Sequence, residues 1–211
     1  MNDLNPLPAV AIRTARPSDE ASIMDICLRT ADAGKDGTQC YSDPRLPGFV
    51  WALPYIRLCP DNAFVLTHGE QVMGYCVAAP DTVAFEECLK KEWWPMLRAE
   101  LQGFSPGTPH DENVLAYIHN PPGTPSRIAD LYPAHLHINV LPELQKGGHG
   151  SRLFSRQIQA LTTSGVTGVH LGINPRNEGV VAFYRRFGLL EIGRTPSIIM
   201  AMRLNHTPAC R

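Results

Sequence analysis

The feature that most constrains the fold is a glycine-rich turn at residues 145–150, Gln-Lys-Gly-Gly-His-Gly. An apolar run over 135–142 precedes it and predicts a strand, and an amphipathic run over 151–161 follows it and predicts a helix. This order places free backbone N–H groups at the positive end of a helix, where a phosphate can bind. No Gly-Lys-Ser/Thr follows the turn, so the pattern is not that of a Walker phosphate loop.

The turn supplies candidate phosphate contacts. Gly148 and Gly150 allow the backbone to approach an anion closely, while Gln145 can hydrogen-bond a phosphate or brace the turn. Lys146 and Arg152 add positive charge at its rim. An ordinary glycine-rich loop between a strand and a helix would have the same composition, so the turn alone leaves both interpretations open.

A second pattern lies downstream, over residues 174–189. Asn177 can cap a helix or direct its amide to a ligand, and Tyr184 follows it on the helix predicted over 179–187. A half-buried tyrosine whose hydroxyl finds a backbone partner would fit the same helix. Val140 and Pro142 precede the turn, and they complete the set of motifs.

Together these motifs resemble the GNAT superfamily of acetyl-CoA-dependent N-acetyltransferases, most specifically over residues 136–188. The resemblance implies an α/β fold with a central, mixed but mostly antiparallel sheet of about seven strands flanked by helices. It also implies a single domain over 1–211, with a long insertion over 80–133 between the third and fourth strands. In that family a bulge splays the strand before the turn, and the pantetheine arm of coenzyme A pairs with this strand.

The function implied by the resemblance is direct transfer of an acetyl group from acetyl-CoA to an amine in a ternary complex. The acceptor is a small molecule or a protein that the sequence does not identify. Tyr184 would protonate the leaving thiolate, and the turn amides would bind the pyrophosphate. The implied coenzyme A-binding residues are Val140, Leu141, Gln145, Lys146, Gly147, Gly148, His149, Gly150, Ser151, Asn177 and Tyr184.

A closer resemblance is to the C-terminal acetyltransferase-like domain of O-GlcNAcase and its stand-alone bacterial relatives. Animal versions of that domain have a degraded glycine-rich turn, whereas this chain keeps the turn. The second class left open is therefore a non-catalytic acetyl-CoA-binding or protein-interaction module. The residues that carry this resemblance are Asp43-Pro44, Phe64-Val65-Leu66, Gly74-Tyr75, Phe85, Lys90-Lys91, Trp93 and Pro95.

The general base is less well defined than the cofactor turn. An amine of the lysine type has a pKa of about 10.4, so a base or a water chain must take its proton. His135 and His137 lie two residues apart on the predicted strand and share a face with Asn139. Val140 lies on the opposite face, which is where family members place their bases. His137 is the candidate base, and two histidines hydrogen-bonded on a half-buried sheet are the alternative.

Other histidine roles follow less directly from the pattern. His149 and His170 are further base candidates. A zinc site from His135, His137 and His170 is conceivable, but two histidines in alternation are weak evidence for a metal. We therefore predict no metal.

Composition argues against several classes of protein. The formal net charge of −1 gives no general attraction to nucleic acid or anionic lipid, and no apolar run approaches the roughly 18 residues of a membrane span. Residues 1–8 lack the basic and apolar regions of a signal peptide, which predicts a cytoplasmic protein. Without Gly-Lys-Ser/Thr or a Mg²⁺ carboxylate pair, a kinase is disfavoured. Scattered cysteines predict reduced, structural thiols at Cys27, Cys40, Cys59, Cys76, Cys88 and Cys210.

The remaining elements follow from hydrophobic periodicity. A helix is expected to start at Pro17, and a short helix over 49–58 is interrupted by Pro54. Residues 83–101 form a further helix, after which 103–133 read as a loop that is functional, flexible or contains short elements. Trp93 and Trp94 fit a cover over the acceptor site, a homodimer contact or a satellite core. The expected strands are 10–16, 63–67, 72–79, 135–141, 168–173, 190–193 and 197–204.

Overall fold

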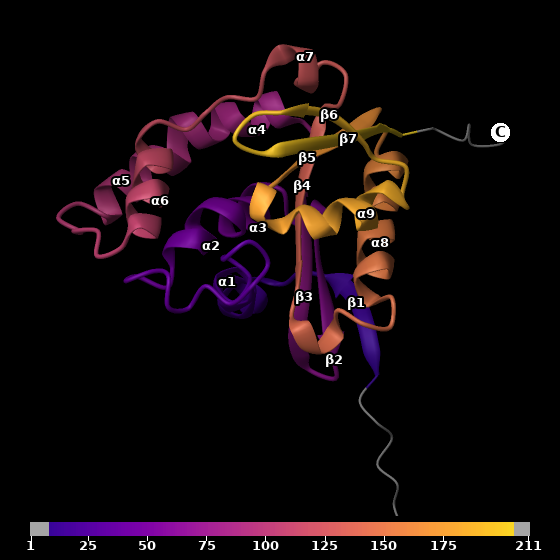
Figure 1. The fold of residues 1–211 in the computed structure, drawn as a ribbon, viewed down its shortest axis with the longest axis horizontal. Helices are drawn as coiled ribbons and strands as arrows, with labels where there is room; N and C mark the ends of the chain where they lie inside the picture. Colours follow the sequence, from indigo (N-terminus) through magenta and orange to yellow (C-terminus); the bar gives the residue numbers. More distant parts are fainter. Residues whose placement is uncertain (1–8, 205–211) are drawn as a thin grey trace, which may run out of the picture.

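The computed structural model describes residues 9–204 of the chain. A seven-stranded sheet lies at its centre in the order β1-β2-β3-β4-β5-β7-β6 (Figure 1). Neighbouring strands are antiparallel except β4 and β5, which run parallel. The strands are β1 Val10–Thr14, β2 Ala63–His68, β3 Gln71–Ala79, β4 Ala134–Val140, β5 Gly168–Ile173, β6 Leu190–Arg194 and β7 Ile198–Arg203.

Helices cover both faces of this sheet (Figure 1). On one face lie α1 Glu20–Leu28, α2 Leu46–Trp51 and α3 Leu53–Leu58, joined by helices from the segment between β3 and β4. On the other face lie α8 His149–Thr163 and α9 Val181–Arg185. Short 3₁₀ turns complete the described chain at Pro17–Asp19, Pro60–Asn62, Pro142–Leu144 and Pro175–Val180.

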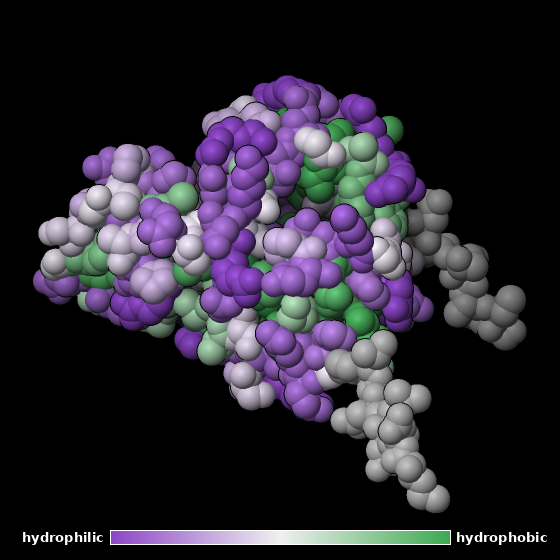
Figure 2. All heavy atoms as spheres, turned by 60° about the horizontal axis from the view of Figure 1, so that its bottom comes forward, coloured by the Kyte–Doolittle hydropathy of each residue, from purple (hydrophilic) through white to green (hydrophobic). Residues whose placement is uncertain are grey.

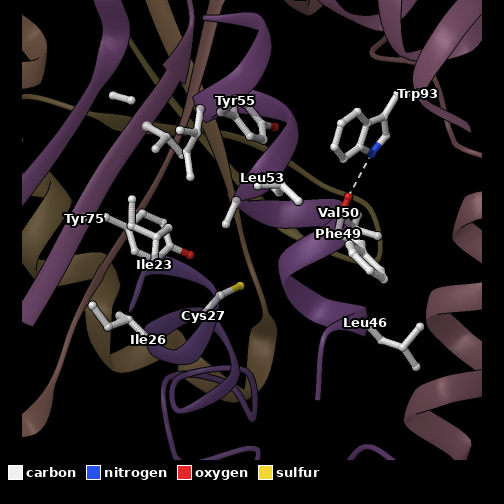
Figure 3. Packing of buried hydrophobic residues seen from close by; sticks show 14 of the residues in the cluster. Ile23, Ile26, Cys27, Leu46, Phe49, Val50, Leu53, Tyr55, Tyr75 and Trp93 are labelled. Atoms are coloured by element: carbon white, nitrogen blue, oxygen red, sulfur yellow. Dashed lines mark hydrogen bonds between the residues drawn. The ribbon is translucent and has the colours of Figure 1, made fainter. Parts of the chain in front are cut away.

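Strand alternation divides the core into two clusters. Successive side chains of a strand point to opposite faces, so Tyr75 and Val77 of β3 join the cluster beneath α1–α3, while Cys76 and Ala78 join the cluster beneath α8. Figure 3 shows the first cluster, in which Ile23 of α1 lies beside Tyr75 and Phe49 of α2 lies beside Trp93. Strands β2 and β3 are buried along almost their whole length, whereas β4 is only partly buried from His137 to Asn139.

The long segment between β3 and β4 is largely helical. It contains α4 Thr82–Cys88, a π-helical turn Leu89–Trp93, α5 Trp94–Glu100, α6 Pro109–His119 and α7 Ser126–Ala129. The predicted helix over 83–101 therefore holds, and the stretch predicted as a loop includes two short helices. Helix α6 begins with a capping box between Thr108 and Asp111, the arrangement that satisfies free N–H groups at a helix start.

The two adjacent tryptophans of this segment belong to the core. Trp93 and Trp94 are both buried, and the Trp93 indole N–H donates to the Phe49 carbonyl at 2.9 Å (Figure 3). A π-helical turn ends at Trp93, directly before the start of α5 at Trp94, and both indoles pack inward. Of the three roles predicted for them, the structure supports the core.

Some predicted boundaries were wrong. The helix over 49–58 breaks at Ala52, whose φ and ψ are −137° and −62°, and not at Pro54. Pro54 lies in the first turn of α3, where its missing N–H costs no hydrogen bond. Helix α8 begins at His149, two residues before the predicted start at 151.

One face of the molecule is largely hydrophilic, and the cysteines of the described residues are free. Figure 2 shows one face of the molecule, on which hydrophilic residues dominate and hydrophobic residues form smaller patches. Among residues 9–204, no helix has the length and apolar character needed to cross a membrane. The cysteines in this range are free, as predicted, whereas Cys210 and the segment 1–8 lie outside the described residues.

Candidate functional site

The central feature of the site is a gap between β4 and β5. Their parallel ladder pairs Ala134 with Val169 and His135 with His170, and it then ends. A cavity of about 680 Å³ lies beyond this point, lined by residues 136–139 of β4 and 171–174 at the end of β5. The two strands therefore separate and leave the backbone edge of β4 accessible along its second half.

The cause of this gap differs from the expected one. The register between β3 and β4 is continuous from Ala79 opposite His135 to Gly74 opposite Val140, so β4 carries no bulge in this ladder. The two strands part after His170 although β4 stays in register with β3 and β5 stays in register with β7 as far as Ile173. The structure thus corrects the mechanism of splaying implied by the family resemblance and keeps its result.

The glycine-rich turn lies at the open end of this gap. Gly147 and Gly148 have φ of 81° and 77°, a left-handed conformation that glycine adopts at little cost. The side-chain amide of Gln145 donates to the carbonyl of Val140 at 3.0 Å, so Gln145 braces the turn. Within residues 9–204, the N–H groups of residues 146–151 donate to no backbone or side-chain acceptor. They form a row of free donors at the start of the 15-residue helix α8.

A second cavity, of about 370 Å³, connects the turn to the gap. Gln145 and Gly150 line it at the turn, and Asn139 and Tyr184 line both this cavity and the larger one. The two cavities therefore form a path from the free amides to the divergence of β4 and β5.

Tyr184 lies on the face of the sheet that α8 and α9 cover, and Asn177 lies in the 3₁₀ segment before α9. Asn174, and not Asn177, is the cap, because its side chain accepts from the Arg176 N–H at 2.9 Å. Asn177 sits at a kink within the 3₁₀ segment and lines both cavities. The Tyr184 ring packs against Phe154 at 5.7 Å between centroids, and burial raises the pKa of its hydroxyl well above the usual value. Tyr184 is therefore a protonated hydroxyl at the cavity wall.

The strand histidines lie on the face predicted for them, opposite Val140. His137 Nε2 lies 3.1 Å from the hydroxyl of Tyr55, and that hydroxyl lies 2.7 Å from His135 Nε2. Thr82 Oγ1 completes the row at 2.8 Å from His135 Nδ1. Desolvation lowers the pKa of His137 to about 4, and the pKa of His135 also lies well below its usual value. Both imidazoles are therefore neutral near pH 7, and His137 lines the larger cavity.

The remaining histidines occupy other positions. His170 Nδ1 lies 2.8 Å from the Tyr132 carbonyl, and its ring lies 5.7 Å from that of His135. Its nitrogen and those of His135 are thus engaged by other groups and do not converge as zinc ligands. His149 is part of the turn, with its Nδ1 buried and unpartnered among the described residues. It does not line the cavity at the strand gap.

Aromatic residues that sequence reasoning missed form the opposite wall of the larger cavity. Tyr41, Trp51, His110 and Tyr117 line it from the loop before α2, from α2 itself and from α6. Tyr117 packs against Trp51 at 6.2 Å between ring centroids. The signal for α6 was present as Thr108-Pro109-x-Asp111, a capping pattern that opens a helix.

A group of possible metal ligands among the described residues includes two residues of the cavity lining, Asp32 and His110. Asp32, Cys40 and His110 offer ligand atoms within 4.8 Å of one another. The carboxylate of Asp32 is already paired with Arg176 at 2.8 Å. This pairing accounts for the carboxylate without an ion.

Free amides at a glycine-rich helix start, with a path into a gap between separated strands, form an arrangement that can hold an elongated phosphate-bearing ligand. Residues 32–189 match the model of the acetyltransferase (GNAT) family. The chain belongs to this family. Its sheet, with the single parallel pair and helices on both faces, is the fold of the solved family members to which it is similar.

The chain is also similar in sequence or structure to known proteins. The crystal structure of SsHAT matches with 35% identity and a TM-score of 0.84, over 94% of this chain and 100% of that chain. Rat (Rattus norvegicus) protein O-GlcNAcase is 22% identical over 186 residues, which cover 87% of this chain and 20% of the rat protein. This chain thus spans about a fifth of that curated relative. A putative acetyltransferase from Salmonella typhimurium, solved with its cofactor acetyl-CoA, has 16% identity and a TM-score of 0.52 over 95% of this chain and 97% of that chain.

Proposed function

We propose that this protein is an acetyl-CoA-dependent N-acetyltransferase, formed by one domain over residues 1–211 with an insertion over 80–133. The observation that carries the proposal is the path from the free amides of residues 146–151 to a cavity lined by both His137 and Tyr184. An acyl donor and a proton acceptor are needed at one end of such a path, and a phosphate site at the other. The free cysteines among the described residues support a reducing compartment such as the cytoplasm.

The residues present fit coenzyme A. The amides of residues 146–151 would hold the pyrophosphate, and Lys146 would add charge at the exposed rim. The edge of β4 from Leu136 to Val140, which β5 leaves unpaired, would hydrogen-bond the pantetheine arm as an added strand. Leu141 and Ser151 flank the turn, and Asn177 lines the path. Acetyl-CoA would supply the acetyl group as a thioester.

Tyr184 and His137 take complementary roles in the proposed reaction. The amine nitrogen bonds to the acetyl carbon, the carbon–sulfur bond breaks, and Tyr184 gives its proton to the departing sulfur. Burial keeps Tyr184 protonated for this step. His137 accepts a proton from the amine nitrogen, and both substrates held in one cavity provide the orientation that accelerates the attack.

The pKa of His137 decides when it acts. A transfer from a free ammonium of pKa about 10.4 to an imidazole of pKa about 4 is unfavourable by about a millionfold. His137 therefore does not deprotonate the ammonium before attack. The acceptor binds as the neutral amine, and His137 removes a proton as the nitrogen bonds to the acetyl carbon, when its N–H groups become acidic.

The test measures binding and turnover separately. We expect acetyl-CoA to raise the melting temperature and to release thiol with at least one amine from a panel of peptides, polyamines and amino sugars. Tyr184→Phe keeps the ring that packs on Phe154, so it should retain acetyl-CoA affinity while kcat falls. Tyr132→Phe, outside both cavities, is the matched control. No melting shift at millimolar acetyl-CoA overturns the proposal. Binding without turnover on any amine supports the non-catalytic acetyl-CoA-binding module instead.

A further inference from the structure

A row of hydrogen bonds runs from the insertion over 80–133 to His137 at the larger cavity. It begins at the backbone carbonyl of Pro133, which lies 2.7 Å from Thr82 Oγ1. It continues from Thr82 to His135 Nδ1 at 2.8 Å, from His135 Nε2 to the Tyr55 hydroxyl at 2.7 Å, and from that hydroxyl to His137 Nε2 at 3.1 Å. Each link joins two groups that can both donate and accept, except the first.

The first link sets the direction of all the others. A carbonyl oxygen only accepts, so the single hydroxyl hydrogen of Thr82 points at Pro133. Thr82 Oγ1 must then accept, and His135 Nδ1 must donate to it. A neutral imidazole carries one N–H, so His135 Nε2 is the acceptor and takes the hydrogen of the Tyr55 hydroxyl. The Tyr55 oxygen in turn accepts from His137 Nε2, which is the protonated nitrogen of that ring.

These hydrogen-bond directions also determine the state of the other ring nitrogen of His137, Nδ1. With its hydrogen on Nε2, the ring presents a bare lone pair at Nδ1. Within residues 9–204 this Nδ1 makes no hydrogen bond, and it is not sealed from solvent as His149 Nδ1 is. Because His137 lines the larger cavity, the lone pair is available to a bound amine.

We propose that Thr82, His135 and Tyr55 are positioning residues that fix His137 in the tautomer with a basic Nδ1. This inference rests on the proposed acetyl transfer, in which His137 takes the amine proton. Thr82 is buried, lines neither the larger cavity nor the path from the turn, and touches no reacting atom. The effect of Thr82 on the reaction passes through the orientation of three hydrogens and not through contact with a substrate.

Removal of the Thr82 hydroxyl should reverse the donor and acceptor roles along the row of hydrogen bonds. In Thr82→Val, an Nδ1–H on His135 would be a buried donor without an acceptor, which costs about 1–3 kcal/mol. His135 then moves its hydrogen to Nε2 and donates to Tyr55, whose hydroxyl turns to His137 Nε2. His137 is left with its hydrogen on Nδ1 and has no lone pair toward the cavity. Thr82→Ser keeps the hydroxyl and is the matched control, and the backbone N–H of residue 82 still satisfies the Pro133 carbonyl at 2.7 Å.

The experiment reads the tautomer directly by long-range ¹H–¹⁵N correlation of the histidine side chains, with assignment by His137→Gln and His135→Gln. We expect His137 to carry its hydrogen on Nε2 in the wild type and in Thr82→Ser, and on Nδ1 in Thr82→Val. With an amine that is turned over, Thr82→Val should lose about 10- to 100-fold in kcat at unchanged acetyl-CoA affinity, and Thr82→Ser should stay near the wild type.

Two results overturn the proposal: a wild-type His137 with its hydrogen on Nδ1, or a Thr82→Val protein whose His137 tautomer is unchanged. If Thr82→Val does not fold, Tyr55→Phe provides the same test. This variant removes the hydroxyl between His135 and His137, so His137 should no longer be held with its hydrogen on Nε2. The nitrogen signals are measured without any acceptor, so failure of acetyl transfer and failure of the tautomer assignment are distinguished.

Discussion

The side-chain amide of Gln145 donates to the carbonyl oxygen of Val140 across 3.0 Å. This bond ties the glycine-rich turn to the last residue of β4, the strand whose free edge leads into the cavity. The bond therefore fixes the position of the free amides of the turn relative to the exposed edge of β4. Such preorganisation lowers the ordering cost of binding a long ligand that contacts both.

Loss of this brace should weaken acetyl-CoA binding more than it weakens the fold. We expect Gln145→Ala to lower the free energy of unfolding by about 1 kcal/mol, the usual net value of one neutral hydrogen bond. The acetyl-CoA Kd should rise about 5- to 10-fold, as measured by calorimetry. Gln159→Ala, an exposed position further along α8, is the control and should leave both quantities unchanged. An unchanged Kd in Gln145→Ala would show that the turn holds its shape without the brace.

A substitution at Gly150 should have opposite effects on the stability of the fold and on the binding of acetyl-CoA. It lies in the first turn of α8, and an added Cβ would meet Val140 Cγ2 at 3.9 Å, an ordinary contact. Alanine is favoured over glycine in a helix by up to about 1 kcal/mol, so Gly150→Ala should raise the melting temperature of the free protein. If the backbone here must approach a pyrophosphate, the same change should raise the Kd for acetyl-CoA.

The control for Gly150→Ala is Ser155→Ala, an exposed position on the same helix. It should stabilise the helix slightly and leave acetyl-CoA affinity unaltered. Equal affinities for Gly150→Ala and the wild type in a calorimetric titration would place the pyrophosphate away from this residue.

Asp111 joins the loop before α2 to helix α6, two of the three elements that carry the aromatic wall of the cavity. Its carboxylate accepts from the Ser42 hydroxyl at 2.6 Å and from the N–H groups of Gly107 at 2.9 Å and Thr108 at 3.0 Å. Burial raises the pKa of this carboxyl, but these hydrogen bonds outweigh it and hold the pKa below the usual value. The carboxylate is thus a buried anion that depends on its donors.

Asp111→Ala should leave those donors without an acceptor and lower the free energy of unfolding by about 2–4 kcal/mol. Urea denaturation measures this loss, and Glu112→Ala, the exposed neighbour on the same helix, is the control. We also expect the acceptor KM to rise in Asp111→Ala, because His110 and Tyr117 lie on the same helix as the lost contact. A midpoint equal to that of the control would contradict the anchoring role.

The sequence predicted the elements of the fold better than the shape of the site. Period-2 and helical patterns located the seven strands, α1, the helical stretch over 82–100 and α8, since burial of each face depends on local spacing, but α6 lay in a stretch predicted as a loop. The break at Ala52 and the π-helical turn before Trp94 were not predicted, because tertiary packing decides them. The spacing of residues in the sequence also did not predict that the pairing of β4 with β5 ends at His135 and His170.

For the candidate site, contiguous motifs were predicted from the sequence, whereas contacts between residues far apart in the sequence were not. The turn over 145–150 and Tyr184 follow from contiguous motifs, and their identification as coenzyme A contacts stays a prediction. His137 was placed on the correct face by strand parity alone. Its link to Tyr55 and Thr82 joins residues more than 50 positions apart in the sequence, at separations of 82 for Tyr55 to His137 and 53 for Thr82 to His135, and no local pattern indicates such contacts.

The strand histidines should make the fold sensitive to mild acid. The pKa of His137 is lowered by desolvation to about 4, and the pKa values of His135 and His170 are also lowered by burial. Below about pH 6.5 the unfolded chain binds more protons at these residues than the folded protein does. The free energy of unfolding therefore falls as the pH decreases from about 6.5 toward 4, by at most about 1.4 kcal/mol per pH unit for each histidine. The lowered pKa of Asp111 adds its own loss only below about pH 4, where the unfolded carboxyl becomes protonated.

Urea unfolding at pH 7, 6 and 5 separates the histidine contribution from that of the carboxyl. His137→Gln retains an amide N–H that can donate to Tyr55 and removes one titrating group, so its stability should fall less steeply over this range. His119→Gln, an exposed position at the end of α6, is the control and should keep the wild-type slope. A slope in His137→Gln equal to that of the wild type would mean that His137 is protonated equally in the folded and unfolded states. In that case, the desolvation that keeps its lone pair free would be absent.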